Sequence, residues 1–448
     1  MTTLAPVTPA TALSTARALP PGPRSTLLST YRLMAAPLRW FPAWRERYGD
    51  PFTVPAVNGT VVMSGEPEAI RAIFAAPGRT FLPFAPQATI PLTGERSIFT
   101  SSGEEHRRDR GLVGQAFQAG RAAAFAPRMA EVAARHAARL ADGQPFVAQD
   151  WGQDVSLEVI LRVVFGLEDA ERLASFRAQI GRTMGALNPA FLFAPFLQRH
   201  LTWLSGYRRF ARERREFARM VQEQIARARA GEAPESVLGI LASAREEGYE
   251  LDDAGLGDQL RTMLVAGHET TATALAFCLG WLLRHPAALE RLRAEVDASS
   301  GDPAETLRLP WLGAVIQESL RIYPLVTEVL RVLAEPLELC GYRLEPGVVV
   351  SPSVLLAHWR EEVFPEPMAF RPERFLERRF SPQEYLPFGG GFRRCLGASF
   401  ATAELHLVLA ELVRRFDLEL LDEGPLRPVR RNVTIAPAGG VRVRARPR

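Results

Sequence analysis

One long, uninterrupted helical pattern constrains the fold of this 448-residue chain more than any other feature. The pattern runs from Ala254 to His285, and Pro286 must end the helix there. Asp252 and Asp253 precede it as candidate N-caps. At ~1.5 Å per residue the helix would be on the order of 48 Å long. Its segments Met263–Val265 and Ala272–Leu283 are apolar on nearly every face, which is typical of a helix buried at the centre of a domain.

The rest of the chain predicts more helix and small β-sheets. Alternating Val residues around Asn58-Gly59 predict a hairpin over Phe52–Ser64, in which Pro55 makes the first arm an edge strand. Two more short β patches are expected, at Gly341–Val350 and Val433–Val443. Helical spacing of Ala, Leu, Arg and Glu predicts further helices over 122–140, 207–229 and 398–416. The fold class is therefore mostly α with small β-sheets.

Domain organisation and the compartment follow from the distribution of residue types. Residues 1–20 are rich in Ala, Thr and Pro and are expected to form a disordered tail, because they lack the basic start and apolar run of a signal peptide or spanning helix. No later stretch has the composition of a linker, so residues 21–448 are predicted to be a single domain without a transmembrane anchor. Three scattered cysteines cannot build a disulfide framework, which favours a reducing, cytoplasmic location.

Composition also excludes several kinds of chemistry. All 54 basic residues are Arg, and without Lys neither Schiff-base catalysis nor a phosphate-binding loop of the Walker type can operate. No basic stripe interleaved with aromatic residues indicates nucleic-acid binding. The sequence Gly-x-Ser-x-Gly of many hydrolases is also missing.

A glycine-rich segment with one thiol stands near the C-terminus, running from Phe388 to Gly397. Its three consecutive glycines let the backbone approach a flat ligand, and Cys395 directly precedes a predicted helix. A thiolate at a helix N-terminus is stabilised by the helix dipole, which suits it to bind iron. A lone cysteine after a glycine loop is also compatible with an inert, buried side chain.

The spacing in this segment resembles the haem-binding signature of the cytochrome P450 family. The positions that carry the resemblance are Phe388, Gly391, Arg393, Cys395 and Gly397. Most of the chain is similar to this family, with the other family motifs in the expected order. The resemblance implies the family's triangular helical prism, with haem b between the long helix and the thiolate loop. It also implies that Cys395 is the iron ligand.

Other family motifs imply a structural network and a proton relay. Glu318 and Arg321 are spaced i, i+3 on one helix face, which alone is compatible with an exposed ion pair. The resemblance adds Arg374 and implies a buried network that braces the thiolate loop. In the long helix it implies that small residues leave room for dioxygen and that an acid and an alcohol relay protons. These residues would be Ala266, Gly267, Glu269 and Thr270.

Several cations are candidates for binding the two haem propionates, because Arg offers a planar fork of donors to a carboxylate. By resemblance they are His106, Arg110, Arg331 and Arg393. Each of them alone is equally compatible with a solvated surface charge.

Substrate contacts are expected in Pro-broken and Phe-rich segments, which imply apolar pocket walls or ordinary core packing. The candidates are Phe81, Phe84, Phe193, Val265, Val326 and Val329. Glu328 departs from the apolar residue usual at its position, and we hypothesise that it contacts a polar end of the substrate.

The expected function is a haem-thiolate monooxygenase that hydroxylates or epoxidises an apolar small molecule with O2. Terpenoids are slightly favoured over steroids, fatty acids and polyketides. No flavin or ferredoxin module is seen after the thiolate segment, so electrons are expected from a ferredoxin or flavodoxin with its NAD(P)H-dependent reductase. The candidates for the surface of this chain that binds such a partner are Arg107, Arg108 and Arg394. The alternatives are a peroxygenase or isomerase of the same family and a non-catalytic haem-binding sensor.

Overall fold

The structure, a computed structural model, describes residues 19–188, 207–246, 248–431 and 433–448. The chain forms two compact units, each built from separate segments. The first unit contains the chain up to Phe84, Val326–Met368 and Phe380–Arg394, and the second contains Ala85–Leu325, Ala369–Arg379 and Cys395–Arg448.

The first unit is built on a mixed sheet with the strand order β1-β2-β8-β5-β3. Strand β2 pairs antiparallel with β1 and parallel with β8, so segments almost 300 positions apart in the chain lie side by side. The strands are β1 (Phe52–Ala56), β2 (Gly59–Ser64), β3 (Phe81–Pro83), β5 (Arg331–Leu333) and β8 (Val349–Pro352), and a separate hairpin joins β6 (Leu337–Leu339) to β7 (Tyr342–Leu344).

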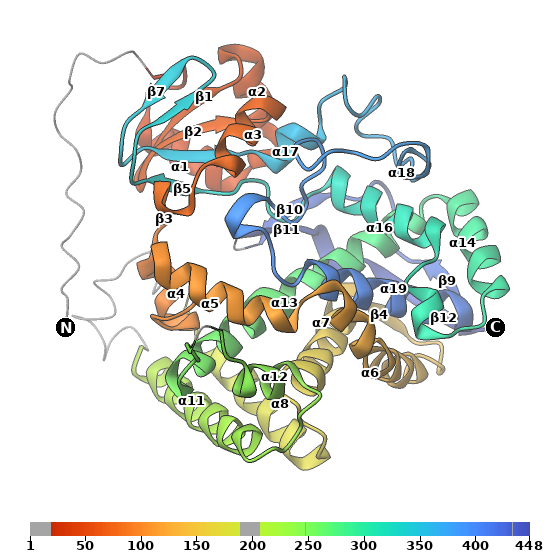
Figure 1. Ribbon diagram of the computed structural model, residues 1–448. Coiled ribbons are helices and arrows are strands. Elements are labelled where there is room, and N and C mark those ends of the chain that lie inside the picture. The colour runs from red at the N-terminus through yellow and green to blue at the C-terminus, as the bar shows by residue number, and fades with distance from the viewer. Residues whose placement is uncertain (1–18, 189–206, 247, 432) are drawn as a thin grey trace. The chain divides into compact units, whose positions relative to one another are not determined.

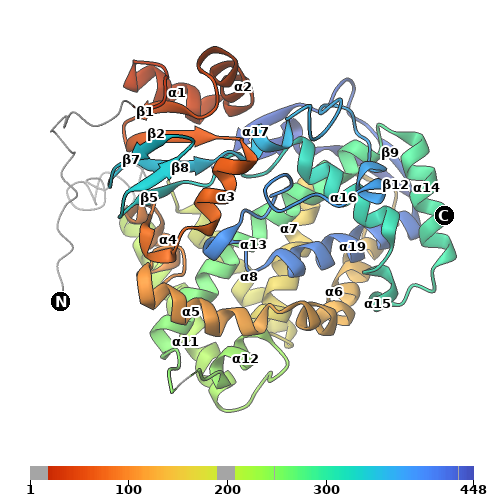
Figure 2. The ribbon, with the colours of Figure 1, turned by 45° about the horizontal axis from the view of Figure 1, so that its top comes forward.

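Alternate residues of this sheet face opposite sides, and each side is covered by helices (Figure 2). Val61 and Met63 pack with residues of α1 and α2, whereas Val62 packs with residues of α3. Pro55 lies in the edge strand β1, as the sequence predicts, because a proline cannot donate to a neighbouring strand. The helices of this unit are α1 (Thr26–Ala35), α2 (Pro37–Tyr48), α3 (Pro67–Ala75) and α17 (Val354–His358), with single 3-10 turns at η1 (Gly78–Thr80) and η3 (Gly391–Arg393).

The second unit is mainly helical and is arranged around the helix α13 (Figure 1). Its other helices are α4 (Pro86–Thr93), α5 (Gly103–Ala116), α6 (Ala119–Ala138), α7 (Ala148–Val159) with its π-helical end η2 (Ile160–Val164), α8 (Ala170–Gly185), α11 (Tyr207–Arg229), α12 (Val237–Ser243), α14 (Pro286–Ala298), α15 (Pro303–Thr306), α16 (Pro310–Ile322), α18 (Arg374–Glu377) and α19 (Ala398–Arg415). Two small sheets complete the unit, in the strand orders β4-β12-β9 and β10-β11. Their strands are β4 (Pro145–Val147), β9 (Phe416–Leu420), β10 (Pro428–Arg431), β11 (Thr434–Pro437) and β12 (Arg442–Pro447), and a 3-10 turn η4 (Ala438–Gly440) lies between the last two.

Helix α13 spans Asp253–Leu282, a length of 30 residues, or about 45 Å at ~1.5 Å per residue. Asp252 is its N-cap, because the side chain accepts a hydrogen bond from the backbone N–H of Gly255. The helix ends at Leu282, three residues earlier than predicted, since Pro286 begins α14 and the turn between them occupies 283–285. Every residue from Thr271 to Leu282 is buried, which explains why this segment is apolar on all faces.

The hairpin at Phe52–Ser64 differs in one detail from the prediction. Ala56 pairs with Gly59, so the two loop residues are Val57 and Asn58 rather than Asn58 and Gly59. Gly59 has a φ of 124° and supplies the backbone freedom just inside the second strand. The predicted tail, residues 1–20, lies outside the described residues as far as residue 18.

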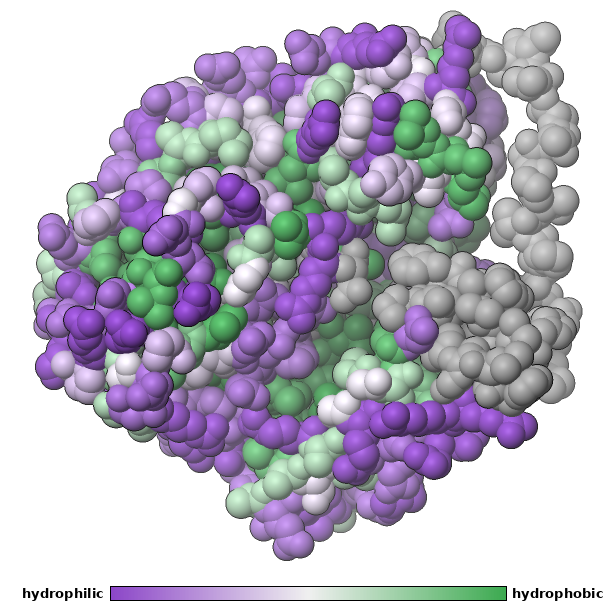
Figure 3. All heavy atoms as spheres, turned by 180° about the vertical axis from the view of Figure 1, so that it is seen from behind, coloured by the Kyte–Doolittle hydropathy of each residue, from purple (hydrophilic) through white to green (hydrophobic). Residues whose placement is uncertain are grey.

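Among the described residues, no single helix is long and apolar enough to cross a bilayer. Helices α13 and α14 meet that criterion only together, as a pair bent by 111°. On the face drawn in Figure 3, hydrophobic residues reach the coloured surface in separate patches among hydrophilic ones.

Candidate functional site

Cys395 is exposed and lies three residues before Ala398, the first residue of α19. The N-cap of this helix is Gly397, which offers no side chain to the backbone N–H groups of the first turn. The positive end of the helix dipole therefore remains available to stabilise a thiolate at this end of the helix. Cys278 is the opposite case, because burial raises the pKa of its thiol to about 12 and keeps it protonated.

The positions before Cys395 require glycine for different physical reasons. Gly389 and Gly391 both have a φ of 64°, in the left-handed region. A Cβ on Gly390 would lie 2.2 Å from the Phe74 ring, so packing inside the first unit already requires that glycine. A Cβ on Gly397 would meet no atom within 4 Å. The open space at Gly397 is compatible with a flat group beside the cysteine.

Arg331 is a buried cation in the first unit, with 1% of its surface exposed. Its guanidinium donates to the Gly390 carbonyl at 2.7 Å and lies 5.1–5.3 Å from the ring centres of Phe74, Phe81 and Phe392. It therefore braces the glycine segment from within the same unit. Arg393 and Phe388, two other predicted haem contacts, are half-buried in that segment.

The remaining predicted propionate ligands, His106 and Arg110, lie in the second unit on α5. They are spaced i, i+4 on one face of the helix, where His106 is buried and Arg110 is half-buried. Each unit thus carries positively charged donors of the kind that a carboxylate requires, Arg331 and Arg393 in the first and these two residues in the second. The described residues thus fit a haem in donor chemistry, with a thiol for the iron and cations for the propionates.

The predicted acid and alcohol both lie on α13. The Thr270 hydroxyl donates to the Ala266 carbonyl at 2.7 Å, and Oε1 of Glu269 lies 3.3 Å from Nε of Arg431 on β10. Burial removes water from the Glu269 carboxylate and raises its pKa, while the nearby Arg431 guanidinium opposes this rise. This acid therefore holds a proton more readily than an exposed glutamate, as a proton relay requires.

Gly267, which follows Ala266 on α13, is tightly packed. A Cβ there would approach Ile160 Cδ1 to 3.2 Å, and the Gly267 carbonyl accepts a hydrogen bond from Ser156 at 3.4 Å. His268, next along the helix, is half-buried, and burial lowers the pKa of its ring. Its ring also bonds the backbone of Gln153, which indicates a packing role.

Glu404 on α19 is a buried acid that the sequence analysis missed. It is 3% exposed, and burial raises its pKa to about 8, although a hydrogen bond with Ser156 opposes the rise. Ser156 thus links Glu404 to the Gly267 carbonyl of α13. The available sequence signal was a glutamate between Ala403 and Leu405 on the apolar side of a predicted helix.

We expect Glu404→Gln to stabilise the chain increasingly as the pH rises from 5 to 9. The folded pKa lies above the ordinary value of 4.5, so the wild type loses stability between about pH 4.5 and pH 8, where only the unfolded chain releases the proton. At pH 9 the difference should reach roughly 3–5 kcal/mol, at about 1.4 kcal/mol per pKa unit. Denaturant unfolding across this range measures it.

Glu411→Gln, which removes an ion-paired acid further along α19, serves as the matched control. A stability difference between Glu404→Gln and the wild type that stays constant from pH 5 to pH 9 would contradict the prediction.

Glu318, Arg321 and Arg374 are brought together in the second unit. Arg321 donates from Nε to Glu318 at 2.7 Å and from a second nitrogen at 2.9 Å, and Arg374 Nε donates to the same carboxylate at 3.1 Å. The Arg371 backbone N–H adds another bond at 2.9 Å. Glu318 and Arg321 are 0% exposed, so this pair is not the exposed ion pair that its spacing alone allowed.

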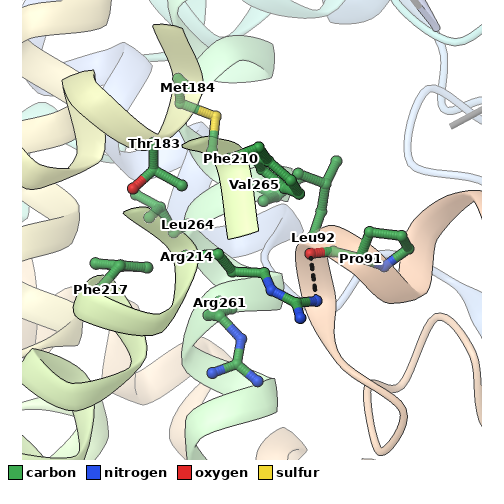
Figure 4. Close-up of a pocket in the computed structure, with 10 residues that line it drawn as sticks. All are labelled: Pro91, Leu92, Thr183, Met184, Phe210, Arg214, Phe217, Arg261, Leu264 and Val265. Carbon is green, nitrogen blue, oxygen red and sulfur yellow. Dashed lines mark hydrogen bonds between the residues drawn. The ribbon is translucent and has the colours of Figure 1, made fainter. Parts of the chain in front are cut away.

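A small pocket in the second unit lies between α4, α8, α11 and α13 and is partly open to solvent (Figure 4). Of the predicted substrate residues, Val265 lines it. The complete lining is Pro91, Leu92, Thr183, Met184, Phe210, Arg214, Phe217, Arg261, Leu264 and Val265.

The other predicted substrate residues lie elsewhere. Phe81 is 1% exposed and stacks on Phe392 in the core of the first unit, and Phe84 packs at the edge of a core cluster there. Val329 packs beside another cluster of that unit, and Val326 is 39% exposed. Phe193 lies outside the described residues. For Phe81 the core interpretation, which the sequence left open, agrees better with the structure.

Glu328 is 8% exposed, and its carboxylate accepts a hydrogen bond from the neighbouring Thr327 hydroxyl. Its backbone forms an isolated bridge with Ser353. These local contacts explain its burial and do not support the hypothesis that Glu328 binds a polar end of the substrate.

Comparisons with known proteins agree with this arrangement. The family model described as cytochrome P450 matches residues 20–441. Putative cytochrome P450 135B1 of Mycobacterium bovis is 36% identical and putative cytochrome P450 135A1 of Mycobacterium tuberculosis is 34% identical, each over 96% of this chain and over 91% and 95% of the relative.

Solved structures agree as well. A retinoic acid-bound cyanobacterial CYP120A1 superposes with a TM-score of 0.81 at 26% identity, over 96% of this chain and all of that one. The haem domain of cytochrome P450DA shares the fold, with a TM-score of 0.82 at 24% identity over 96% of this chain and 98% of that one. The chain belongs to the cytochrome P450 family, whose members are haem-thiolate monooxygenases with haem b as cofactor.

Proposed function

We propose that this P450 hydroxylates or epoxidises an apolar small molecule, with dioxygen as the oxygen source. The observation that carries the proposal is the placement of Glu269 next to Thr270 on helix α13, directly before the buried segment from Thr271 to Leu282. An acid and an alcohol at this position would be costly to bury without a use, and proton delivery during oxygen activation provides one.

The roles of the residues follow from their chemistry. The haem, when bound, supplies the iron centre at which dioxygen is activated. Cys395 would hold the iron, and the cations on α5, on β5 and in the glycine segment would bind the propionates. Glu269 would hold and deliver a proton, and Thr270, fixed by its bond to Ala266, would orient the acceptor. As part of this proposal, both compact units together form the single P450 domain of residues 21–448.

The substrate class is inferred from the pocket on α13. Its walls are mainly apolar side chains, which favour a hydrophobic compound. The 26% identical cyanobacterial protein was solved with retinoic acid, an apolar terpenoid acid, bound to it. The second observation supports the preference for a terpenoid, whereas the apolar walls suit a steroid, a fatty acid or a polyketide equally well.

The electrons are proposed to come from a separate ferredoxin or flavodoxin with its reductase. The basic docking candidates remain Arg107, Arg108 and Arg394, all of which are exposed. Arg107 forms an ion pair with Glu104 at 2.6 Å, and Arg108 lies 4.8 Å from the Tyr249 ring, so neither charge is as available as the sequence implies.

No disulfide joins the three cysteines, all of which are described, and this supports the proposed cytoplasmic location.

The source of oxygen tests the proposal against a peroxygenase. We expect the holoenzyme, with dioxygen, NADPH and a ferredoxin with its reductase, to convert a terpenoid and to incorporate ¹⁸O from labelled dioxygen. Turnover with hydrogen peroxide alone should be much slower, because the acid and alcohol serve a reaction that consumes protons. Product formation only from peroxide, or an isomerised product without added oxygen, would contradict the proposal. Oxygen binding without any product would favour the other alternative, a non-catalytic haem-binding sensor.

Arg431→Gln tests whether the ion pair across β10 and α13 controls Glu269. Because Arg431 opposes the rise of the Glu269 pKa, its loss should raise that pKa further. The limb of the pH profile that depends on Glu269 should therefore move to higher pH, by less than about one unit, since the pair is partly exposed. The measurement is product formed per NADPH consumed from pH 6 to pH 9.

Two variants make this test specific. Arg427→Gln, an exposed change before the same hairpin, should leave the pH profile in place. In a Glu269→Gln background, Arg431→Gln should have no further effect on the profile. A shift that persists without Glu269 would mean that Arg431 acts through another group.

A further inference from the structure

The pocket between α4, α8, α11 and α13 carries two guanidinium groups on walls that are otherwise mostly apolar. Arg261 lies on α13 and Arg214 on α11, and both line the pocket (Figure 4). No sequence motif singles out either residue among the 54 arginines. A pair of cations facing an apolar pocket is unusual, because each charge loses water there.

The position of Arg214 follows from the face of the helix that carries it. Phe210, Arg214 and Phe217 are spaced i, i+4 and i+7, so they lie on one face of α11, and all three line the pocket. One guanidinium nitrogen of Arg214 donates to the Pro91 carbonyl on α4 at 3.3 Å. This bond satisfies one of its five donors and neutralises no charge.

Arg261 has one acidic partner, Asp258, one turn earlier on the same helix. Burial lowers the pKa of Arg261, Asp258 opposes this change, and the positive charge of Arg214 adds to it. The two guanidinium groups are therefore close enough to repel each other. The Asp258 carboxylate pairs with Arg261 and also accepts a hydrogen bond from the Arg96 backbone N–H.

A second carboxylate for Arg214 is missing from the part of the chain that the structure describes, where no ion pair includes this residue. Residues 1–18 and 189–206 contain no Asp or Glu, and Glu247 is the one acidic residue outside the described part of the chain. Among the described residues, one positive charge of the pair is thus left for a ligand.

We propose that Arg214 and Arg261 form an anion subsite that selects substrates with a carboxylate on an apolar skeleton. This proposal rests on the proposed function and defines its substrate class more closely. A guanidinium fork matches a carboxylate in geometry, and the apolar walls would hold the hydrocarbon part.

The subsite also predicts where on the substrate oxidation occurs. Arg261 precedes Ala266 by five residues on α13, a rise of on the order of 7.5 Å along the helix axis. A substrate anchored by its carboxylate at Arg261 would present carbons remote from that group to the residues around Ala266. The favoured products are therefore acids oxidised far from the carboxyl end.

The test compares free acids with their methyl esters on the holoenzyme. The probes are farnesoic acid with methyl farnesoate, and dodecanoic acid with methyl dodecanoate. Affinity is measured by isothermal titration calorimetry and by the change in the haem absorption spectrum. We expect the wild type to bind each acid about tenfold or more tightly than its ester, because a hydrogen bond to a charged group is a strong one.

Arg214→Gln should weaken binding of both acids by about tenfold or more and leave the esters within about twofold. Arg214→Lys should restore part of the preference, because it keeps the charge but not the fork. Arg209→Gln is the matched control, since this arginine is exposed on the same helix and does not line the pocket. Equal binding of acid and ester by the wild type, or an unchanged preference in Arg214→Gln, would overturn the proposal.

The two proposals fail in different ways. Oxygen-dependent oxidation of the esters without any preference for acids would leave the monooxygenase function intact and remove the anion subsite. Acid binding that depends on Arg214, without oxidation of any probe by dioxygen, would support the subsite and contradict the proposed function.

Discussion

Cys395→Ser is expected to abolish the thiolate-type spectrum of the reduced enzyme with carbon monoxide bound, and to remove its monooxygenase activity. An alcohol does not supply the negative charge with which a thiolate increases electron density at the iron. Changes next to a metal ligand alone typically cost about 10- to 100-fold in activity or affinity. Loss of the ligand itself should therefore exceed that range. The measurements are the carbon monoxide difference spectrum, the haem content and product formation.

Two further variants keep this prediction testable if the serine variant binds haem poorly. Cys395→His offers an imidazole to the iron and should retain haem without the thiolate-type spectrum. Cys340→Ser changes the other exposed cysteine and should leave the spectrum unaltered. A thiolate-type spectrum in Cys395→Ser would show that another residue binds the iron.

Glu318→Gln is expected to destabilise the chain by roughly 3–5 kcal/mol, the usual cost of breaking a buried ion pair by removing one partner. The carboxylate is 0% exposed and accepts bonds from two arginines and one backbone N–H. With a neutral amide in its place, Arg321 and Arg374 would lose the buried negative charge that they share. Denaturant unfolding followed by circular dichroism measures the change.

The matched control is Glu216→Gln on α11. Glu216 pairs with Arg219 at the same i, i+3 spacing as Glu318 and Arg321, but on an exposed surface. Its loss should change stability far less, because water already screens such a pair. Equal losses in the two variants would mean that burial does not set the importance of the Glu318 network.

Much of the fold was predictable because it depends on local patterns. The spacing of apolar residues predicted the end of α11 at Arg229 and both ends of α19 within one residue. The end of α13 was predicted three residues late, because a proline excludes the helix after it and does not specify the turn before it. The hairpin turn was one residue off for a similar reason, since the register depends on pairing across both strands.

For the candidate site, the sequence identified residue types and motifs but not their surroundings. It proposed Phe81 as a substrate contact, whereas the structure buries Phe81 against Phe392 in a core. It could not assign Glu404 or Arg214, because both are ordinary residues of amphipathic helices until neighbouring helices pack around them. The desolvation that raises the pKa of Glu404 comes from residues distant in the chain.

The sequence by itself determined the family, the long apolar helix and the cysteine that follows the glycine segment, because each depends on residues close together in the chain. Only the tertiary structure decided that Glu318 holds two buried arginines, that Glu269 faces Arg431, and that Arg214 and Arg261 share one pocket. These features depend on the distances between elements and on the exclusion of water, which arise only when the helices pack.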